Sequence, residues 1–136
     1  RASIAGASGG CQAEIGSASA MAAGALVYLR GGSCEQILAA VAMSLKNLLG
    51  LVCDPVSGLV EVPCVKRNVI GAVNAMSAAD MALAGIQSMI RPTIIDAMKE
   101  VGDLMDVSLR ETGRGGLAAT RRGVEIRERL QGEAAE

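Results

Sequence analysis

The feature that most constrains the fold is an apolar core that must be built almost without aromatic side chains. Hydrophobic residues make up 51% of the chain, yet it contains no Phe, no Trp and a single tyrosine, Tyr28. The core volume has to come from Ala, Leu, Val, Ile and seven Met, while 17 Gly let backbones approach closely. Small residues and methionine suit tightly packed helices, and no segment shows the two-residue alternation of a strand. We therefore predict an all-α fold, a compact bundle of about five helices with the methionines in its core.

Helical periodicity and end signals place these helices. We expect them over five segments, 13–29, 34–49, 66–83, 94–105 and 119–136. The first is rich in Ala, Met and Leu and is expected to be buried on most sides. Ser33 followed by Gln36 is a capping-box pattern at the start of the second helix, which Gly50 closes. The third ends near Gly85, and Thr93 is the expected N-cap of the fourth.

Three irregular stretches, 1–12, 51–65 and 110–118, are marked by Gly or Pro and read as loops. The final segment, 119–136, is charged, and we expect a solvated helix that frays over its last five residues. Because the helices are composed mainly of small apolar residues, we expect function to concentrate in the three loops.

Charge and composition argue against two classes of partner. The formal net charge is −1 and no aromatic platform exists for stacking bases, so we expect no nucleic acid binding. The most apolar stretch, 15–29, holds two Ser and two Gly and is short against the ~20 residues of a membrane span. With no secretory leader and only four Cys, we expect reduced thiols in a cytoplasmic protein. The start at Arg1 indicates a piece of a longer chain.

Three cysteines lie in the irregular stretches, each within two residues of Gly or Pro. These are Cys11, Cys53 and Cys64, whereas Cys34 begins a predicted helix. An isolated cysteine is most often a small buried apolar residue. Loop placement, however, lets thiolates converge from distant positions and leaves backbone N–H groups free to bond sulfur.

A thiolate-only site without histidine favours zinc bound by four cysteines or an iron–sulfur cluster. The paired spacing of a structural zinc site is absent, and with no His in the chain zinc would need Cys34 as a fourth ligand. Three ligands from these loops fit a four-iron cluster with one iron left open. Such an iron is a Lewis acid that can bind a hydroxyl and a carboxylate.

Three segments carry a family resemblance: "GCQAEIGSASAMAAGAL" (10–26), "LGLVCDPVSGLVEVPCVKRNVIGAVNA" (49–75) and "RETGRGGLA" (110–118). They resemble the C-terminal part of the α subunit or α domain of iron–sulfur L-serine dehydratases. The intervals also agree with that family, since 41 residues separate Cys11 from Cys53 and ten separate Cys53 from Cys64.

The resemblance implies a [4Fe–4S] cluster on Cys11, Cys53 and Cys64, whose open iron binds L-serine for deamination to pyruvate and ammonia without pyridoxal phosphate. It implies a lyase of amino-acid degradation and gluconeogenesis, with residues 1–118 as the cluster-binding part and 119–136 as a tail. Cys34 stands where the family usually has proline, so it gains no ligand role. The implied partners are L-serine, the remainder of the α domain and a β subunit or domain, within an oligomer.

The sequence departs from the family pattern in two respects, which limit what the resemblance implies. Lys66 stands where the family usually has Glu, which changes the charge beside Cys64. The family's upstream glycine-rich and serine-binding segments are absent from this sequence. We therefore expect this chain alone to be an incomplete enzyme.

No residue is a convincing general base for removing the Cα proton. Asp54, Glu61 and Lys66 are loop candidates, although a turn bond to its own backbone before the following proline is the more ordinary role for Asp54. Arg67 and Asn68 are candidates to orient the substrate carboxylate, and solvent-facing positions at the start of a helix explain them equally well.

Four further residues are candidates for supporting contacts. Gln12 and Glu14 flank the first cysteine segment, though the helix dipole also favours Glu14 near a helix start. Arg110 and Glu111 are candidates to close over the site, or to form a surface ion pair.

Two alternatives to a serine dehydratase stay open. One is a related cluster lyase acting on L-threonine or L-cysteine, which would differ in its substrate pocket. The other is a non-catalytic helical module whose cysteines bind zinc or nothing.

Overall fold

A computed structural model describes residues 2–89 and 93–134 of the chain. Within these residues the fold is all-α, apart from an isolated bridge between Cys53 and Arg110. The six α-helices of this described part are α1 (Gly6–Gly9), α2 (Ser17–Leu29), α3 (Cys34–Asn47), α4 (Lys66–Leu83), α5 (Thr93–Leu104) and α6 (Arg121–Glu133). Shorter 3₁₀ or π turns occupy Gln12–Gly16, Val56–Gly58, Glu61–Val65, Val107–Leu109 and Gly116–Ala119. The prediction of an all-α bundle is confirmed.

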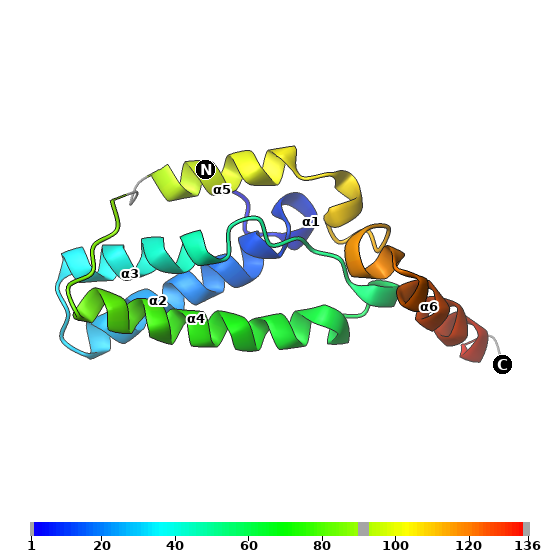
Figure 1. The fold of residues 1–136 in the computed structure, drawn as a ribbon, viewed down its shortest axis with the longest axis horizontal. Coiled ribbons are helices and arrows are strands. Elements are labelled where there is room, and N and C mark those ends of the chain that lie inside the picture. The colour runs from blue at the N-terminus through cyan, green and yellow to red at the C-terminus, as the bar shows by residue number, and fades with distance from the viewer. Residues whose placement is uncertain (1, 90–92, 135–136) are drawn as a thin grey trace.

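The long helices α2, α3 and α4 form the body of the molecule, α5 lies along α3, and α6 projects from one end (Figure 1). Alanine dominates the core between the three long helices, whose buried members are Ala23, Val27, Ala39, Ala40, Met43, Ala75, Ala78, Ala79 and Ala82. A second cluster joins the bundle to α5 through Ala20, Ala42, Leu45, Ile94 and Met98. Such small side chains bring the helix axes close together, so the core is filled without aromatic rings.

A buried polar network sets the register of the three long helices. The Ser44 hydroxyl donates to the Ser19 hydroxyl (2.8 Å), and the Ser19 hydroxyl donates to the Gly71 carbonyl (2.6 Å). The Asn74 amide donates to the hydroxyls of Ser19 and Ser44, each at 3.0 Å. Because a buried polar group is costly without a partner, this arrangement favours one alignment of α2, α3 and α4.

Most predicted helix ends are close to those observed. The Ser33–Gln36 capping box is present in full, and Cys34 is the first residue of α3. This helix ends two residues earlier than expected, and Gly50 follows with a positive φ of 85°. Gly85, with φ 89°, follows the end of α4. The helix α5 begins at Thr93; residues 90–92 before it, and residues 135–136 of the segment expected to fray, lie outside the described residues.

The N-terminal stretch is more ordered than its glycine content indicates. Residues 1–12 were expected to form a loop, but they include α1 and the start of a π turn that leads into α2. A Cβ at Gly102 of α5 would lie 3.3 Å from the Gly9 Cα, so glycine on both sides permits this short helix to pack closely. Tertiary packing thus orders a segment that has little helix propensity of its own.

Two burial predictions are wrong in part. The helix α2 is not buried on most sides, because α3 and α4 cover it and leave another side open, with exposed Ala18, Met21, Ala22, Ala25 and Leu29. The methionines are divided between the two environments. Met43, Met98 and Met105 are buried, whereas Met21, Met76 and Met89 are exposed.

The helix α4 also presents an apolar side to solvent. Its exposed members include Val69, Val73 and Met76, and Val65 just before the helix continues the same helical spacing. Together with the open side of α2, they give this part of the molecule an unusual amount of exposed apolar surface. Over residues 2–89 and 93–134, no helix has both the length and the apolar character that crossing a membrane would require.

Candidate functional site

Three of the four cysteines lie together. Cys11 precedes the π turn that leads into α2, Cys53 lies in the extended segment after α3, and Cys64 lies just before α4. All three share one cluster of side-chain contacts, in which Cys11 and Cys53 are buried and Cys64 is half-buried. Cys34 is exposed at the start of α3, at the opposite end of the bundle (Figure 1). The fold therefore brings thiols together across the sequence and separates the fourth from them.

Burial and mutual repulsion oppose ionisation of two of these thiols. Burial is the main cause that raises the pKa of Cys53, and the charges of Cys11 and Cys64 add to it. Burial and Cys11 likewise raise the pKa of Cys64, whereas the Arg67 guanidinium acts in the opposite direction. A thiol with a raised pKa is protonated at neutral pH, so a metal that binds here has to displace protons.

The donor set fits a thiolate-bound group in kind, because it contains three sulfurs and the chain has no histidine. In the arrangement observed, the neighbouring Cys11 thiol adds to the rise in the pKa of both Cys53 and Cys64. Within the described part of the chain, no three His, Cys, Asp or Glu side chains are placed to hold a metal ion. The three cysteines are thus gathered as neighbouring thiols, and ligation would require their deprotonation and reorientation.

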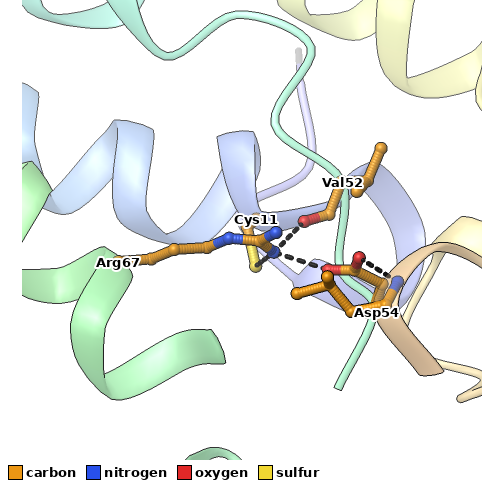
Figure 2. Close-up of polar contacts among 5 residues, drawn as sticks. Cys11, Val52, Asp54 and Arg67 are labelled. Carbon is orange, nitrogen blue, oxygen red and sulfur yellow. Dashed lines mark hydrogen bonds and ion pairs between the residues drawn. The ribbon is translucent and has the colours of Figure 1, made fainter. Parts of the chain in front are cut away.

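Arg67 of α4 points toward Cys11, Val52 and Asp54 (Figure 2). Its Nη1 atom donates to Asp54 Oδ1 (2.7 Å), to the Val52 carbonyl (2.8 Å) and to Cys11 Sγ (3.8 Å). Burial alone would lower the pKa of Arg67, but its hydrogen bonds to Asp54 and Cys11 outweigh burial and raise it. The solvent-facing alternative for Arg67 is therefore wrong. Asn68 is exposed, and its side-chain amide donates to the Cys64 carbonyl (3.0 Å).

Asp54 connects the loop 51–65 with the loop 110–118, which are far apart in the sequence. One carboxylate oxygen accepts from Arg67, and the other accepts from the backbone N–H of Leu117 (2.8 Å). The turn bond expected of Asp54 is thus replaced by contacts to α4 and to the second glycine-rich loop. A Cβ at Gly116 would lie 2.3 Å from Asp54 Oδ2, so glycine is needed for this approach. The glycine pair before Leu117 was the available sequence signal, although it did not identify the partner.

The loop 110–118 lies along the Cys53 segment. The Cys53 N–H donates to the Leu109 carbonyl (2.8 Å), and the Glu111 N–H donates to the Cys53 carbonyl (2.7 Å). The Arg110 side chain donates to the carbonyls of Met105 and Asp103, each at 2.8 Å, and so binds the C-terminal end of α5. The contacts of Arg110 thus fasten the loop to α5, and those of Glu111 fasten it to Cys53.

The two polar residues beside Cys11 hold its segment in place. Gln12 is 1% exposed; its amide donates to the Met98 carbonyl (3.0 Å), and its amide oxygen accepts from the Gly50 N–H (2.9 Å). Glu14 accepts from the Gly6 N–H (3.0 Å). Gln12 therefore ties the Cys11 segment to α5 and to the turn after α3.

Two of the candidate residues, Glu61 and Asn68, line cavities at the surface. Glu61 and Lys66 are exposed. Glu61 lines a cavity of about 300 Å³ between its own loop and α6, with Leu59, Val62 and Ile126 among the lining residues. A second cavity, of about 200 Å³, lies between α2 and α4, where Ser19 and Asn68 are its polar residues.

The sequence matches proteins of one family. The model of the family described as serine dehydratase alpha chain matches residues 1–118. The chain is 63% identical over 134 residues to the probable L-serine dehydratase, alpha chain, of Bacillus subtilis (strain 168), covering 98% of this chain and 45% of that protein. It is 55% identical over 127 residues to the L-serine dehydratase, alpha chain, of Peptoniphilus asaccharolyticus, covering 93% and 44%. It is also 48% identical over 119 residues to L-serine dehydratase 1 of Escherichia coli (strain K12), covering 86% and 26%.

The chain therefore spans about half or less of the length of these three relatives. The family match nevertheless includes all three clustered cysteines, Arg67, Asp54 and the loop that contacts them. By the extent of the family match and the level of identity, this chain belongs to the serine dehydratase alpha chain family.

Proposed function

We propose that this chain is the cluster-bearing part of an iron–sulfur L-serine ammonia-lyase, which converts L-serine to pyruvate and ammonia. The observation that carries the proposal is the gathering of Cys11, Cys53 and Cys64 from three separated segments into one contact cluster beside Arg67. Names of relatives support the serine substrate, since several are called L-serine dehydratase. The iron–sulfur cofactor is our inference from the thiol-only donor set.

In this proposal Cys11, Cys53 and Cys64 hold a [4Fe–4S] cluster. When bound, a cluster with one iron free of protein ligands supplies a Lewis acid for departure of the serine hydroxyl. The chain's own contribution is to bring three sulfurs together and to place a permanent positive charge beside them. Cys34 is left out, because it is exposed and distant from the others.

The start of α4 is the proposed contact for the substrate carboxylate. Lys66 and Arg67 occupy its first turn, where the helix dipole already provides partial positive charge. Two cationic side chains at this end repel the positive end of the helix dipole and so destabilise the helix. An anion bound there would relieve this repulsion. We propose Asn68 as a hydrogen-bond donor to the carboxylate, and Arg67 as a contact through guanidinium atoms other than Nη1.

Among the candidates for the general base, Asp54 is disfavoured in this proposal. It is 3% exposed, and its two oxygens accept from Arg67 and Leu117. A base must reach the proton that it removes. Glu61 and Lys66 are exposed and stay candidates, as do groups on a partner segment.

We further propose that the open apolar side of α2 and α4 packs against the remainder of an α domain or a β subunit, within an oligomeric enzyme of the cytoplasm. Exposed Val65, Val69, Val73 and Met76 support this surface. Residues 1–118 would form the cluster-binding part, and 119–136 a separate charged tail. Val69→Lys and Val73→Lys variants test this surface. If the isolated chain self-associates through it, the added charge should reduce self-association and raise solubility.

Anaerobic reconstitution with iron and sulfide tests the cofactor. We expect a brown protein with iron and sulfide in near-equal amounts and with visible absorbance that air bleaches. A colourless protein that holds stoichiometric zinc would contradict the proposal and favour a non-catalytic module. Pyruvate release from L-serine, compared with products from L-threonine and L-cysteine, then tests the substrate in the presence of the relatives' missing portions.

A further inference from the structure

We infer that Arg67 is a positioning residue for the sulfur ligands: its guanidinium, held by Asp54, fixes the Cys53 segment against Cys11. This inference rests on the proposed function for its link to a cluster, and on the observed contacts for the positioning itself. The Nη1 atom of Arg67 is occupied by acceptors of the protein itself. The positioning role of Arg67 is therefore distinct from the substrate contact proposed for its other guanidinium atoms.

The first support is the arrangement of acceptors around one nitrogen. Arg67 Nη1 donates to Val52 and to Asp54, the residues on either side of Cys53, and it also reaches Cys11 Sγ (Figure 2). A single guanidinium from α4 therefore holds two of the three cysteine segments. Cys64 lies three residues before Arg67, in the π turn that leads into the same helix, so the segments of all three cysteines lie next to this residue.

The second support is that the Cys53 segment is held from its other side as well. The Cys53 N–H and carbonyl bond to Leu109 and Glu111, and Asp54 accepts from the Leu117 N–H. The loop 110–118 thus depends on Asp54 keeping its orientation, and Asp54 depends on Arg67. Loss of Arg67 is expected to loosen both loops together.

The third support is burial. The side chains of Arg67 and Asp54 are 14% and 4% exposed, whereas those of the Arg30–Asp80 pair are 55% and 63% exposed. Removing one partner of a buried ion pair leaves the other charge buried without compensation. When one partner of an exposed pair is removed, water solvates the remaining charge. The exposed pair also involves a residue of α4, so Arg30→Gln is a matched control for loss of an arginine.

The first measurement is amide hydrogen exchange in the metal-free full chain, comparing wild type, Arg67→Gln, Arg67→Lys and Arg30→Gln. We expect Arg67→Gln to speed exchange over 51–55 and 115–118 by roughly tenfold or more, since hydrogen bonds to charged groups are lost there. Arg30→Gln should leave these segments unchanged, and Arg67→Lys should be intermediate because lysine keeps the charge without the planar fork. Equal exchange in Arg67→Gln and wild type would overturn the inference.

The second measurement is iron and sulfide content after anaerobic reconstitution, with the electron paramagnetic resonance spectrum of the reduced protein. Arg67→Gln should retain less than half of the wild-type iron and change the spectrum, with partial recovery in Arg67→Lys. Faster exchange with unchanged iron content and spectrum would overturn the positioning of sulfur ligands. If wild type takes up no iron, the proposed function fails, and the exchange comparison alone then decides whether Arg67 positions the loops.

If the Arg67→Gln variant does not fold, a second variant still tests the inference. The double variant Arg67→Gln/Asp54→Asn removes both charges, so no buried charge remains unpaired. We expect it to fold and still to show faster exchange over 51–55 and 115–118. Wild-type exchange in the double variant would contradict the inference.

Discussion

Arg67 and Asp54 form an ion pair that is almost completely withdrawn from solvent, with 2.7 Å between Nη1 and Oδ1. The pair joins the start of α4 to the segment that carries Cys53, and the free carboxylate oxygen continues the connection to Leu117. In this chain the Cys53 loop and the second glycine-rich loop are thus connected to α4 through one charged pair, Arg67 and Asp54.

We predict that Asp54→Asn destabilises the fold far more than Asp80→Asn. The first change leaves Arg67 with a weakened buried partner, which should lower the free energy of unfolding by about 3 kcal/mol. The second affects a pair whose members are more than half exposed, which should cost about 0–1 kcal/mol. Urea denaturation of both variants measures the difference. Equal losses would show that the buried pair does not hold the loops.

The substitution Gly116→Ala is expected to be more harmful than Gly31→Ala. Both glycines have positive φ, 57° and 75°, so alanine is strained at either position. At Gly31 an added Cβ meets nothing within 4 Å, whereas at Gly116 it would lie 2.3 Å from Asp54 Oδ2. We expect a loss of about 1 kcal/mol for Gly31→Ala and a further 1–3 kcal/mol for Gly116→Ala. Thermal unfolding of the two variants checks this, and similar melting temperatures would refute the clash.

Cys34 should be dispensable for iron binding. We expect Cys34→Ser to keep the wild-type iron content after anaerobic reconstitution, whereas Ser at Cys11, Cys53 or Cys64 should reduce it sharply. The physical reason is location, because three thiols share one cluster and Cys34 is exposed at the start of α3, away from that cluster. Equal iron loss in all four variants would support a four-thiolate site instead.

The reactivity of the native thiols gives an independent prediction. In the metal-free protein, a thiol reagent should label Cys34 first, because Cys11 and Cys53 are only 1% and 3% exposed. Mass spectrometry of digested protein identifies the labelled site. Prior labelling of Cys53 would mean that its loop opens readily in solution.

We predict that this chain alone lacks serine dehydratase activity even after its cofactor is rebuilt. It spans 45% of the Bacillus subtilis alpha chain, and among residues 2–89 and 93–134 none is both accessible and clearly placed as a base beside the cysteines. General base catalysis contributes typically ~10²–10⁴-fold, and loss of substrate positioning would lower the rate further. An anaerobic pyruvate assay at saturating L-serine tests this. Turnover comparable to that of a full-length relative would contradict the prediction and direct attention to Glu61 and Lys66.

The sequence by itself determined the features that depend on near neighbours. The capping box of Ser33 and Gln36 and the positive φ of Gly85 involve atoms within a few residues of one another. The all-α class followed from helical spacing and small side chains. The convergence of the cysteines was anticipated from Gly or Pro within two residues of each of them, together with the family resemblance.

Only the tertiary structure decided what Arg67, Asp54 and the open sides of α2 and α4 do. Thirteen residues separate the numbers of Arg67 and Asp54, and 63 separate those of Asp54 and Leu117. Neither separation along the chain matches a helical or strand repeat, so the sequence does not predict these contacts. An apolar side of a helix is visible in the sequence, but whether a neighbour covers it depends on where the other helices pack. The inward turn of Arg67 depends likewise on two loops that form a buried acceptor site only after the chain has folded.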